Sequence, residues 1–164
     1  MLQITHRTAY LKETRLAGLS AKLSLDENTT PALWQQFMPR LGEIDGRLND
    51  DLLSLAIYPP HYFRDFDFAT SFEKIAAVEI GKSVNLPEGL TEFIVPAGLY
   101  VVFDYRGSSS DNNIFQYIFA HWLPNSPYEL ADRPHFEVLG ANYKNDDPDS
   151  EEEIWIPVSP KAQG

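Results

Sequence analysis

The spacing of hydrophobic residues in the first half of the chain predicts a strand, a helix and two more strands. Residues 14–24 have strand character, and residues 29–44 carry apolar side chains at helical spacing. Residues 52–60, which end at two prolines, favour a second strand. Residues 72–81 favour a third strand, with a helix as the alternative. The expected order of this half is therefore strand, helix, strand, strand.

The helix expected over residues 29–44 has a start signal and an interruption. Thr29 or Thr30 can cap its first turn, and Pro31 fits that turn because its missing N–H would have no partner there. Pro39 lies inside the pattern and should kink the helix or end it early. The apolar residues of this helix are Trp34, Phe37, Leu41 and Ile44.

The second half has the same order of elements. Residues 90–107 predict one long strand, or two strands separated by a turn at 96–98. Residues 108–124 predict an amphipathic helix, and residues 133–140 and 152–159 predict the last two strands. The two halves would then be related by the order of their elements and not by letter-for-letter similarity.

The second helix also has recognisable ends. Ser110 or Asp111 can cap it, and Pro124 closes it. Its apolar residues fall at positions i, i+3, i+4 and i+7, namely Phe115, Ile118, Phe119 and Trp122.

Two halves of this kind predict an α+β fold. We expect one stand-alone domain over residues 1–164, built from two pseudo-repeats at about 10–82 and 88–160. The strands would form an antiparallel or mixed sheet with both helices packed on one face. The other face would be left to solvent or to a cleft at the seam between the halves, where pockets often lie.

Composition narrows the possible functions. The chain has 164 residues, 43% of them hydrophobic, and lacks the run of about 20 apolar residues that a membrane helix needs. A net charge of −11 with no basic cluster argues against direct binding of nucleic acid. The absence of cysteine excludes disulfides and thiolate chemistry, and a cytoplasmic location is the simplest expectation.

Metal and cofactor motifs are missing from the sequence. The acidic segment 145–153 lacks the spacing of an EF-hand, so a solvated loop is the preferred interpretation. The four histidines are scattered without the spacing of metal ligands. Neither a G-x-S-x-G motif nor a phosphate-binding glycine loop is present. We expect no metal and no cofactor.

Glu137 stands in the middle of the apolar run RPHFEVLG, residues 133–140. Strand alternation places Phe136 and Val138 on one face and Glu137 on the other. A buried carboxylate needs a partner or water, because an isolated charge is costly in an apolar interior. Glu137 could therefore be a rim residue in a salt bridge, an edge-strand charge that discourages aggregation, or a carboxylate that faces a ligand.

The order of several segments over residues 2–159 resembles the gyrase-inhibitor-like (GyrI-like) small-molecule-binding domain. These segments are LAGLS, LWQQF, PAGLYVVFDYRG, HWLPNSP, RPHFEVLG and EEEIWIPVS. The same domain is the effector-binding part of multidrug-responsive transcription regulators. The resemblance implies a duplicated strand–helix–strand–strand fold, a ligand cleft between the halves, and an inner glutamate that faces cationic, often aromatic ligands.

Three positions match the residues that the resemblance implies for ligand binding. They are Glu137 within P-x-F-E, Tyr100 after P-A-G-x, and Trp155 before the final I-P-V. Leu139 and Lys74 stand where relatives often have aromatic residues, so the identity of the ligand does not transfer. The regulators carry a DNA-binding domain before this module, which we do not expect here.

Further residues could complete the cleft. Trp155 alternates with Ile154 and Ile156, so it would face the open side of the sheet if the isoleucines pack on the helices. Tyr58 is a weaker candidate for the wall, and His135 would share the face of Glu137 as a hydrogen-bond partner or as a structural residue. Aromatic faces and a carboxylate together would bind a lipophilic cation.

The function that these residues favour is binding of lipophilic, cationic aromatic small molecules, as a sensor or a sequestering module. One alternative is a hydrolase of reactive drug-like molecules with Glu137 as general acid/base. Another is a protein-interaction module of the gyrase-inhibitor type that uses its acidic surface.

Overall fold

The computed structural model of the chain describes residues 3–81, 85–109 and 111–162. The strands are β1 (Gln3–Leu11), β2 (Thr14–Leu23), β3 (Leu52–Ile57), β4 (Phe72–Glu79), β5 (Thr91–Val95), β6 (Gly98–Arg106), β7 (Tyr128–Leu130), β8 (His135–Leu139) and β9 (Glu151–Pro160). The helices are α1 (Thr30–Phe37), a 3₁₀ turn η1 (Met38–Glu43), α2 (Asn113–Gln116) and a π-helical turn η2 (Tyr117–Trp122).

Among the described residues, nine strands form one sheet in the order β1-β6-β9-β8-β3-β4-β2-β5, with β7 paired to β9. Every strand pair within the described residues is antiparallel. β3 and β8 pair at the centre of the sheet. β4 and then β2 follow on the β3 side, and β9 and then β6 follow on the β8 side. This agrees with the expected α+β fold and antiparallel sheet, while a true duplication of the halves stays a prediction.

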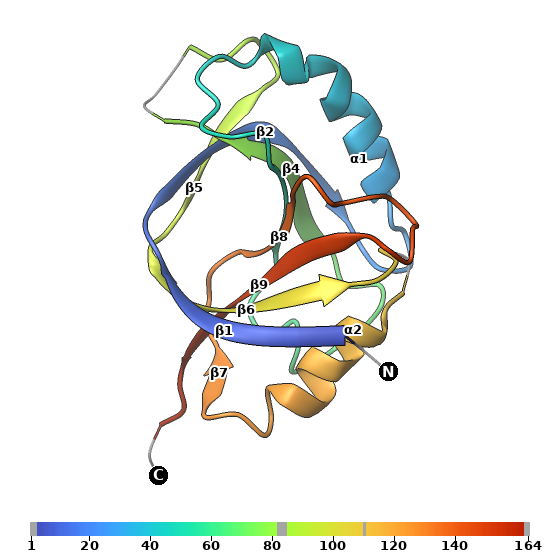
Figure 1. Ribbon diagram of the computed structural model, residues 1–164, viewed down its shortest axis with the longest axis vertical. Helices are drawn as coiled ribbons and strands as arrows, with labels where there is room; N and C mark the ends of the chain where they lie inside the picture. The colour runs from blue at the N-terminus through green and yellow to red at the C-terminus, as the bar shows by residue number, and fades with distance from the viewer. Residues whose placement is uncertain (1–2, 82–84, 110, 163–164) are drawn as a thin grey trace.

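β1 and β2 together follow one long bent path, and β5 and β6 follow a second one beside it (Figure 1). β1 and β2 are separated by only two residues, and so are β5 and β6. Leu11 pairs with Gly98, and Thr14 pairs with Val95, so one antiparallel register continues across both bends. The bends therefore join the two sides of the sheet into a curved surface.

The predicted strands are present, but β1 and β7 were not predicted. Within the described part of the chain β1 is an edge strand that pairs with β6 alone, and its sequence QITHRTAYL mixes polar and apolar residues on both faces. Such a strand buries little of its own surface, so it lacks the apolar pattern by which the other strands were found. β7 has only three residues, which is too short for a period to be read.

The first helix ends where the sequence predicts, but the hydrogen bonds at the starts of the helices are only partly those expected. α1 stops at Phe37 and continues as a 3₁₀ turn at Met38, directly before Pro39, as the proline predicted. Neither helix has a hydrogen bond from its N-cap side chain. Instead Asn28 accepts a hydrogen bond from the backbone N–H of Thr30, and Asp111 accepts one from that of Asn113. Ser110 lies outside the described residues.

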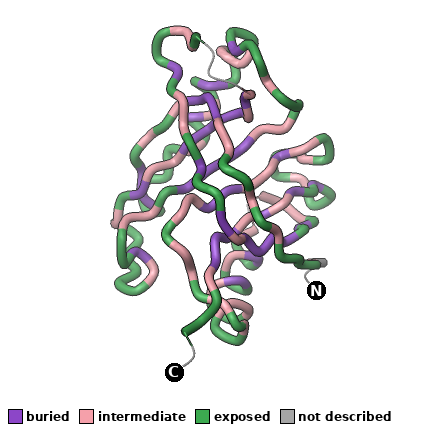
Figure 2. Tube along the Cα trace, turned by 90° about the vertical axis from the view of Figure 1, so that its left-hand side faces the viewer, coloured by how far each residue is buried: buried purple, intermediate pink, exposed green. Residues whose placement is uncertain are grey.

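Each helix packs on its own part of the sheet (Figure 1). Leu33 and Phe37 of α1 lie in one core cluster with Ala76 of β4. Ile114 of α2 and Ile154 of β9 lie in another. Figure 2 shows that buried positions follow the strands through the middle of the molecule, whereas the outer loops are exposed. Among the described residues no helix is long and apolar enough to cross a membrane.

Gly18 of β2 is predicted to be intolerant of any side chain. It lies between β4 and β5, and an added Cβ would meet the backbone carbonyl oxygen of Ala76. Gly18→Ala should lower the free energy of unfolding by about 1–3 kcal/mol or more, because the backbone cannot move without breaking the ladder. Denaturant unfolding measures this change.

Gly42→Ala is the matched control, since no atom lies within 4 Å of a Cβ placed there. It should change the free energy of unfolding by less than about 1 kcal/mol. Equal destabilisation by both substitutions would show that the close approach of Gly18 to β4 is not a constraint.

Candidate functional site

Strand register divides the candidate residues between two faces of the sheet. Phe136 of β8 pairs with Trp155 of β9 and with Leu55 of β3, so these three side chains share one face. We call it the cleft face. Glu137, the next residue, pairs with Ile154 and Ser54 and therefore points to the opposite face.

Residues of α1 and α2 contact side chains that point to the opposite face. Ser54 pairs with Ala76, which packs with α1, and Ile154 packs with α2. We call this the helix-packed face. Glu137 lies between these two contact regions, in the same row of side chains.

A hollow of about 210 Å³ lies on the cleft face. Residues from β1, β2, β3, β4, β5, β8 and β9 line it, so it lies between the two sides of the curved sheet. Its apolar walls include Leu11, Leu16, Leu53, Leu55, Val95, Phe136, Val138 and Trp155. The hollow has the position and the apolar lining of a small-molecule site.

Aromatic rings form one end of this wall. The rings of Trp155 and Phe136 stack with centroids 5.1 Å apart and an interplanar angle of 16°. Tyr100 packs edge-on against Trp155 at 5.7 Å but is itself fully buried. Its hydroxyl donates a 2.8 Å hydrogen bond to the carbonyl of Pro134, and burial raises its pKa to about 12. Tyr100 thus supports the wall from behind, while Trp155 is partly exposed.

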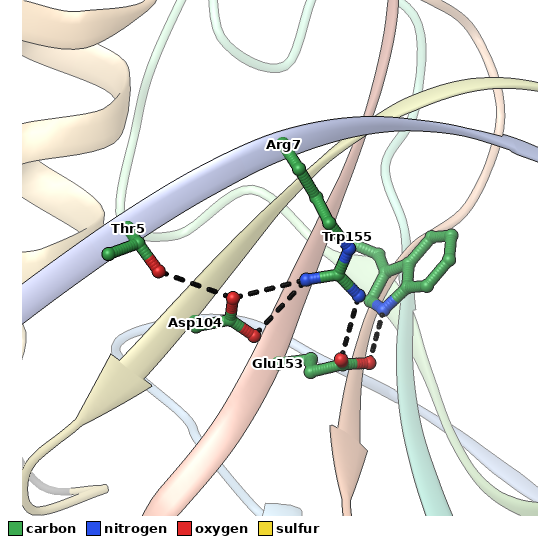
Figure 3. A network of polar contacts seen from close by, with 5 residues as sticks. All are labelled: Thr5, Arg7, Asp104, Glu153 and Trp155. Carbon is green, nitrogen blue, oxygen red and sulfur yellow. Dashed lines mark hydrogen bonds and ion pairs between the residues drawn. The ribbon is translucent and has the colours of Figure 1, made fainter.

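A carboxylate network adjoins Trp155 (Figure 3). The indole Nε1–H donates a 3.1 Å hydrogen bond to Oε1 of Glu153. Nη2 of Arg7 donates a 2.8 Å hydrogen bond to Oε2 of the same carboxylate. Nη1 of Arg7 contacts both oxygens of Asp104 at 3.2 and 3.1 Å, and Thr5 donates to Oδ2 of Asp104. Two carboxylates and one guanidinium leave this network with one negative charge.

A second, open hollow of about 920 Å³ continues from the first. The two share Asp51, Val138 and Glu153 in their linings. The acidic residues around the larger hollow are Asp51, Asp104, Glu151, Glu152 and Glu153, against the single basic residue Arg106 in the same lining. The entrance therefore carries a negative potential that favours cations.

Glu137 lies beside a second carboxyl group on the helix-packed face. Burial, then the charge of Glu137 and a hydrogen bond with Glu137, together raise the pKa of Glu152 to about 9, while the charge of Lys74 opposes the shift. Two carboxyl groups this close share one proton more readily than they carry two charges. Glu152 is therefore the neutral, protonated partner of this pair at neutral pH.

His135 and Tyr58 belong to an aromatic cluster on the same face as Glu137. The imidazole packs edge-on against Tyr58 at 4.9 Å and stacks on Phe63 at 5.6 Å. Burial, and then the charge of Lys74, lowers the pKa of His135 to about 3, so the imidazole is neutral. Burial raises the pKa of Tyr58, with smaller effects from Tyr62 and Glu137.

The structure therefore brings Tyr100 and Trp155 together on the cleft face, and Glu137, His135 and Tyr58 on the helix-packed face. Whether any of the five contacts a ligand stays a prediction. Sequence reasoning missed Glu153, although it lies two residues before Trp155 and strand alternation alone puts both on one face. Within the described residues no group of three or more His, Asp or Glu could hold a metal ion.

Comparison with known proteins finds one family and several related folds. Residues 5–159 match the GyrI-like small molecule binding domain. The transcriptional regulator BrlR of Pseudomonas aeruginosa is 32% identical over 145 residues, which is 87% of this chain and 51% of BrlR. The chain thus spans about half the length of this relative.

Solved structures share the fold at low sequence identity. The EcmrR C-terminal domain has a TM-score of 0.69 at 11% identity, over 98% of this chain and 99% of that one. SAV2435, solved bound to tetraphenylphosphonium, has a TM-score of 0.64 at 18% identity, over 94% of each chain.

The raised pKa of Glu152 predicts how stability changes with pH. Between the ordinary value of 4.5 and about 9, the folded chain keeps a proton that the unfolded chain has lost, so stability falls as pH rises. His135 acts in the opposite direction only below its ordinary value of 6.5. Glu152→Gln should therefore flatten the fall in stability between pH 6.5 and 8.5, by up to about 1.4 kcal/mol per pH unit.

Chemical denaturation at several pH values measures this slope. The control is Glu151→Gln, a change at the exposed neighbouring residue, which should leave the slope as in the wild-type chain. If Glu152→Gln has the wild-type slope as well, Glu152 is not protonated in the folded state.

Proposed function

The chain belongs to the family of GyrI-like small-molecule-binding domains, and on this premise we propose that it binds lipophilic, cationic aromatic molecules on its cleft face. The bound molecule would rest against Trp155 and Phe136. The charge of Glu153 would face its cationic centre. In this arrangement both helices cover one face of the sheet. Two related halves form the sheet, and the ligand lies on the other face, between the two halves.

The observation that carries this proposal is the contact between Trp155 and Glu153. The indole and the carboxylate are joined by a 3.1 Å hydrogen bond at the wall of an apolar hollow. An aromatic face attracts a cation by about 0.5–2 kcal/mol. A carboxylate adds an attraction that water screens less beside apolar walls than in bulk solvent.

The surrounding charges support a cationic ligand over an anionic one. Besides the protonated Glu152, the linings of the two joined hollows contain the acidic residues Asp51, Glu79, Asp104, Glu151 and Glu153. Arg106 is the basic residue of these linings, and it also lies 3.2 Å from Asp149. A lipophilic cation would enter this field readily, because its hydration shell is weakly held.

Glu137 has a different part in this proposal from the one that the resemblance implies. Its carboxylate lies on the helix-packed face with Glu152, His135 and Tyr58, and neither hollow includes it in its lining. We propose that Glu153 supplies the counter-charge to the ligand. The role of Glu137 as ligand carboxylate, or as acid/base of a hydrolase, stays a prediction that the same experiment tests.

Tetraphenylphosphonium is a suitable first probe, since it is the ligand in the SAV2435 structure. We expect saturable binding by isothermal titration calorimetry. Glu153→Gln should weaken this binding at least about tenfold, because it removes one unit charge beside the ligand. Neutral triphenylphosphine oxide should bind Glu153→Gln and the wild-type chain with affinities within about twofold of each other, since no charge attraction is lost.

Glu137→Gln is the matched control, because it makes the same chemical change on the other face of β8. It should change the affinity for tetraphenylphosphonium by less than about threefold, since its carboxylate does not line the cleft. The proposal is wrong if Glu137→Gln abolishes binding and Glu153→Gln leaves it intact. That result would place the ligand on the helix-packed face.

A further inference from the structure

We propose that Arg7 determines which cations the cleft accepts: it engages Glu153 and Asp104 from within the chain, so that the site favours cations without N–H donors over cations that must donate hydrogen bonds. This inference rests on the proposed function and adds the class of cation to it. Quaternary ammonium and phosphonium ions belong to the favoured class, and primary ammonium ions to the disfavoured one.

The carboxylates of Glu153 and Asp104 already accept hydrogen bonds from side chains of the chain itself (Figure 3). Both oxygens of Glu153 accept a hydrogen bond, one from Trp155 and one from Arg7. Both oxygens of Asp104 accept one from Arg7, and Oδ2 accepts another from Thr5. A ligand that donates hydrogen bonds therefore finds about half of the acceptor positions of these carboxylates already taken by groups of the chain.

The network of Arg7, Asp104 and Glu153 keeps one net negative charge. Arg7 neutralises one of the two carboxylates and leaves the other, so the network attracts a cation through its field but offers fewer open acceptor positions than two free carboxylates would. The hydrogen bond with Glu153 raises the pKa of the Arg7 guanidinium above its ordinary value, so this internal cation stays charged. A primary ammonium ion loses strong hydration on entry and regains few hydrogen bonds there, whereas a quaternary ion has little hydration to lose.

Arg7 lies on β1, where its side chain is partly exposed. This strand lies at the edge of the sheet and pairs with β6. The Arg7 side chain is 47% exposed, and those of Asp104 and Glu153 are 50% and 35% exposed. Partly exposed ion pairs of this kind contribute little to stability. Replacing Arg7 should therefore change ligand selection without unfolding the chain.

The experiment compares two probes with the same ring and the same charge, (2-naphthylmethyl)trimethylammonium and (2-naphthylmethyl)ammonium, in which three N-methyl groups replace three N–H donors. Calorimetry at pH 7 and low salt gives a dissociation constant for each. The wild-type chain should prefer the quaternary ion. Arg7→Gln should bind both ions more tightly, by roughly three- to tenfold for the quaternary one. The primary ion should gain more, so that the preference is lost or reversed.

Arg15→Gln is the matched control, since Arg15 is also a strand arginine in an ion pair, 3.1 Å from Glu92. It precedes Leu16 of the cleft-face core, so its side chain points to the other face. This variant should keep the wild-type preference. Arg7→Lys, which retains the charge, should keep the wild-type affinity for the quaternary ion within about twofold.

Three results would overturn the inference. An Arg7→Gln variant that binds both ions with unchanged preference shows that Arg7 does not select the ligand, while the proposed function stands. An Arg7→Gln variant that binds both ions more weakly by the same factor shows that Arg7 only holds Trp155 and Glu153 in place. If neither the wild-type chain nor Arg7→Gln binds either ion, the proposed function and this inference both fail.

Discussion

The pairing of β8 with β9 is the constraint on which the rest of the site depends. Side chains alternate along a strand, so placing Phe136 opposite Trp155 also places Glu137 opposite Ile154. A shift by one residue would send the aromatic pair to the helices and the carboxylate to the cleft. The aromatic stack with Tyr100 behind it, and the burial of Ile154 against α2, both favour the observed register.

This register gives the two faces of the sheet different chemistry. The cleft face combines an apolar hollow with a network of two carboxylates and one guanidinium. The helix-packed face holds a carboxyl pair in which burial favours the protonated form, next to a neutral imidazole. A fixed negative charge lies on the first face, and a shared proton on the second. Only the cleft face suits a cationic ligand whose charged group has no hydrogen-bond donors.

Much of the fold could be predicted from the sequence, because strands such as β3 and β9 are apolar at regular spacing and Pro39 interrupts the first helix as expected. β1 could not be predicted, since an edge strand with exposed residues lacks that spacing. The cleft position of Glu153 follows from Trp155 by alternation. Its contact with Arg7 does not, because the two are 146 positions apart and only the sheet order brings β1 near β9. Likewise, the sequence predicts that Glu137 and Trp155 lie on two consecutive strands, but it does not predict which residues of these strands pair with each other.

The location of a bound cation on the cleft face can be tested by NMR on the indole N–H signals. Trp34 and Trp122 pack against the core clusters of the two helices, whereas Trp155 lies in the cleft lining. Titration with tetraphenylphosphonium, with the Trp155 signal assigned through Trp155→Phe, should shift that signal and leave the other two in place. Shifts confined to Trp34 or Trp122, with the Trp155 signal unchanged, would show that the ligand binds on the helix-packed face and would contradict the central claim.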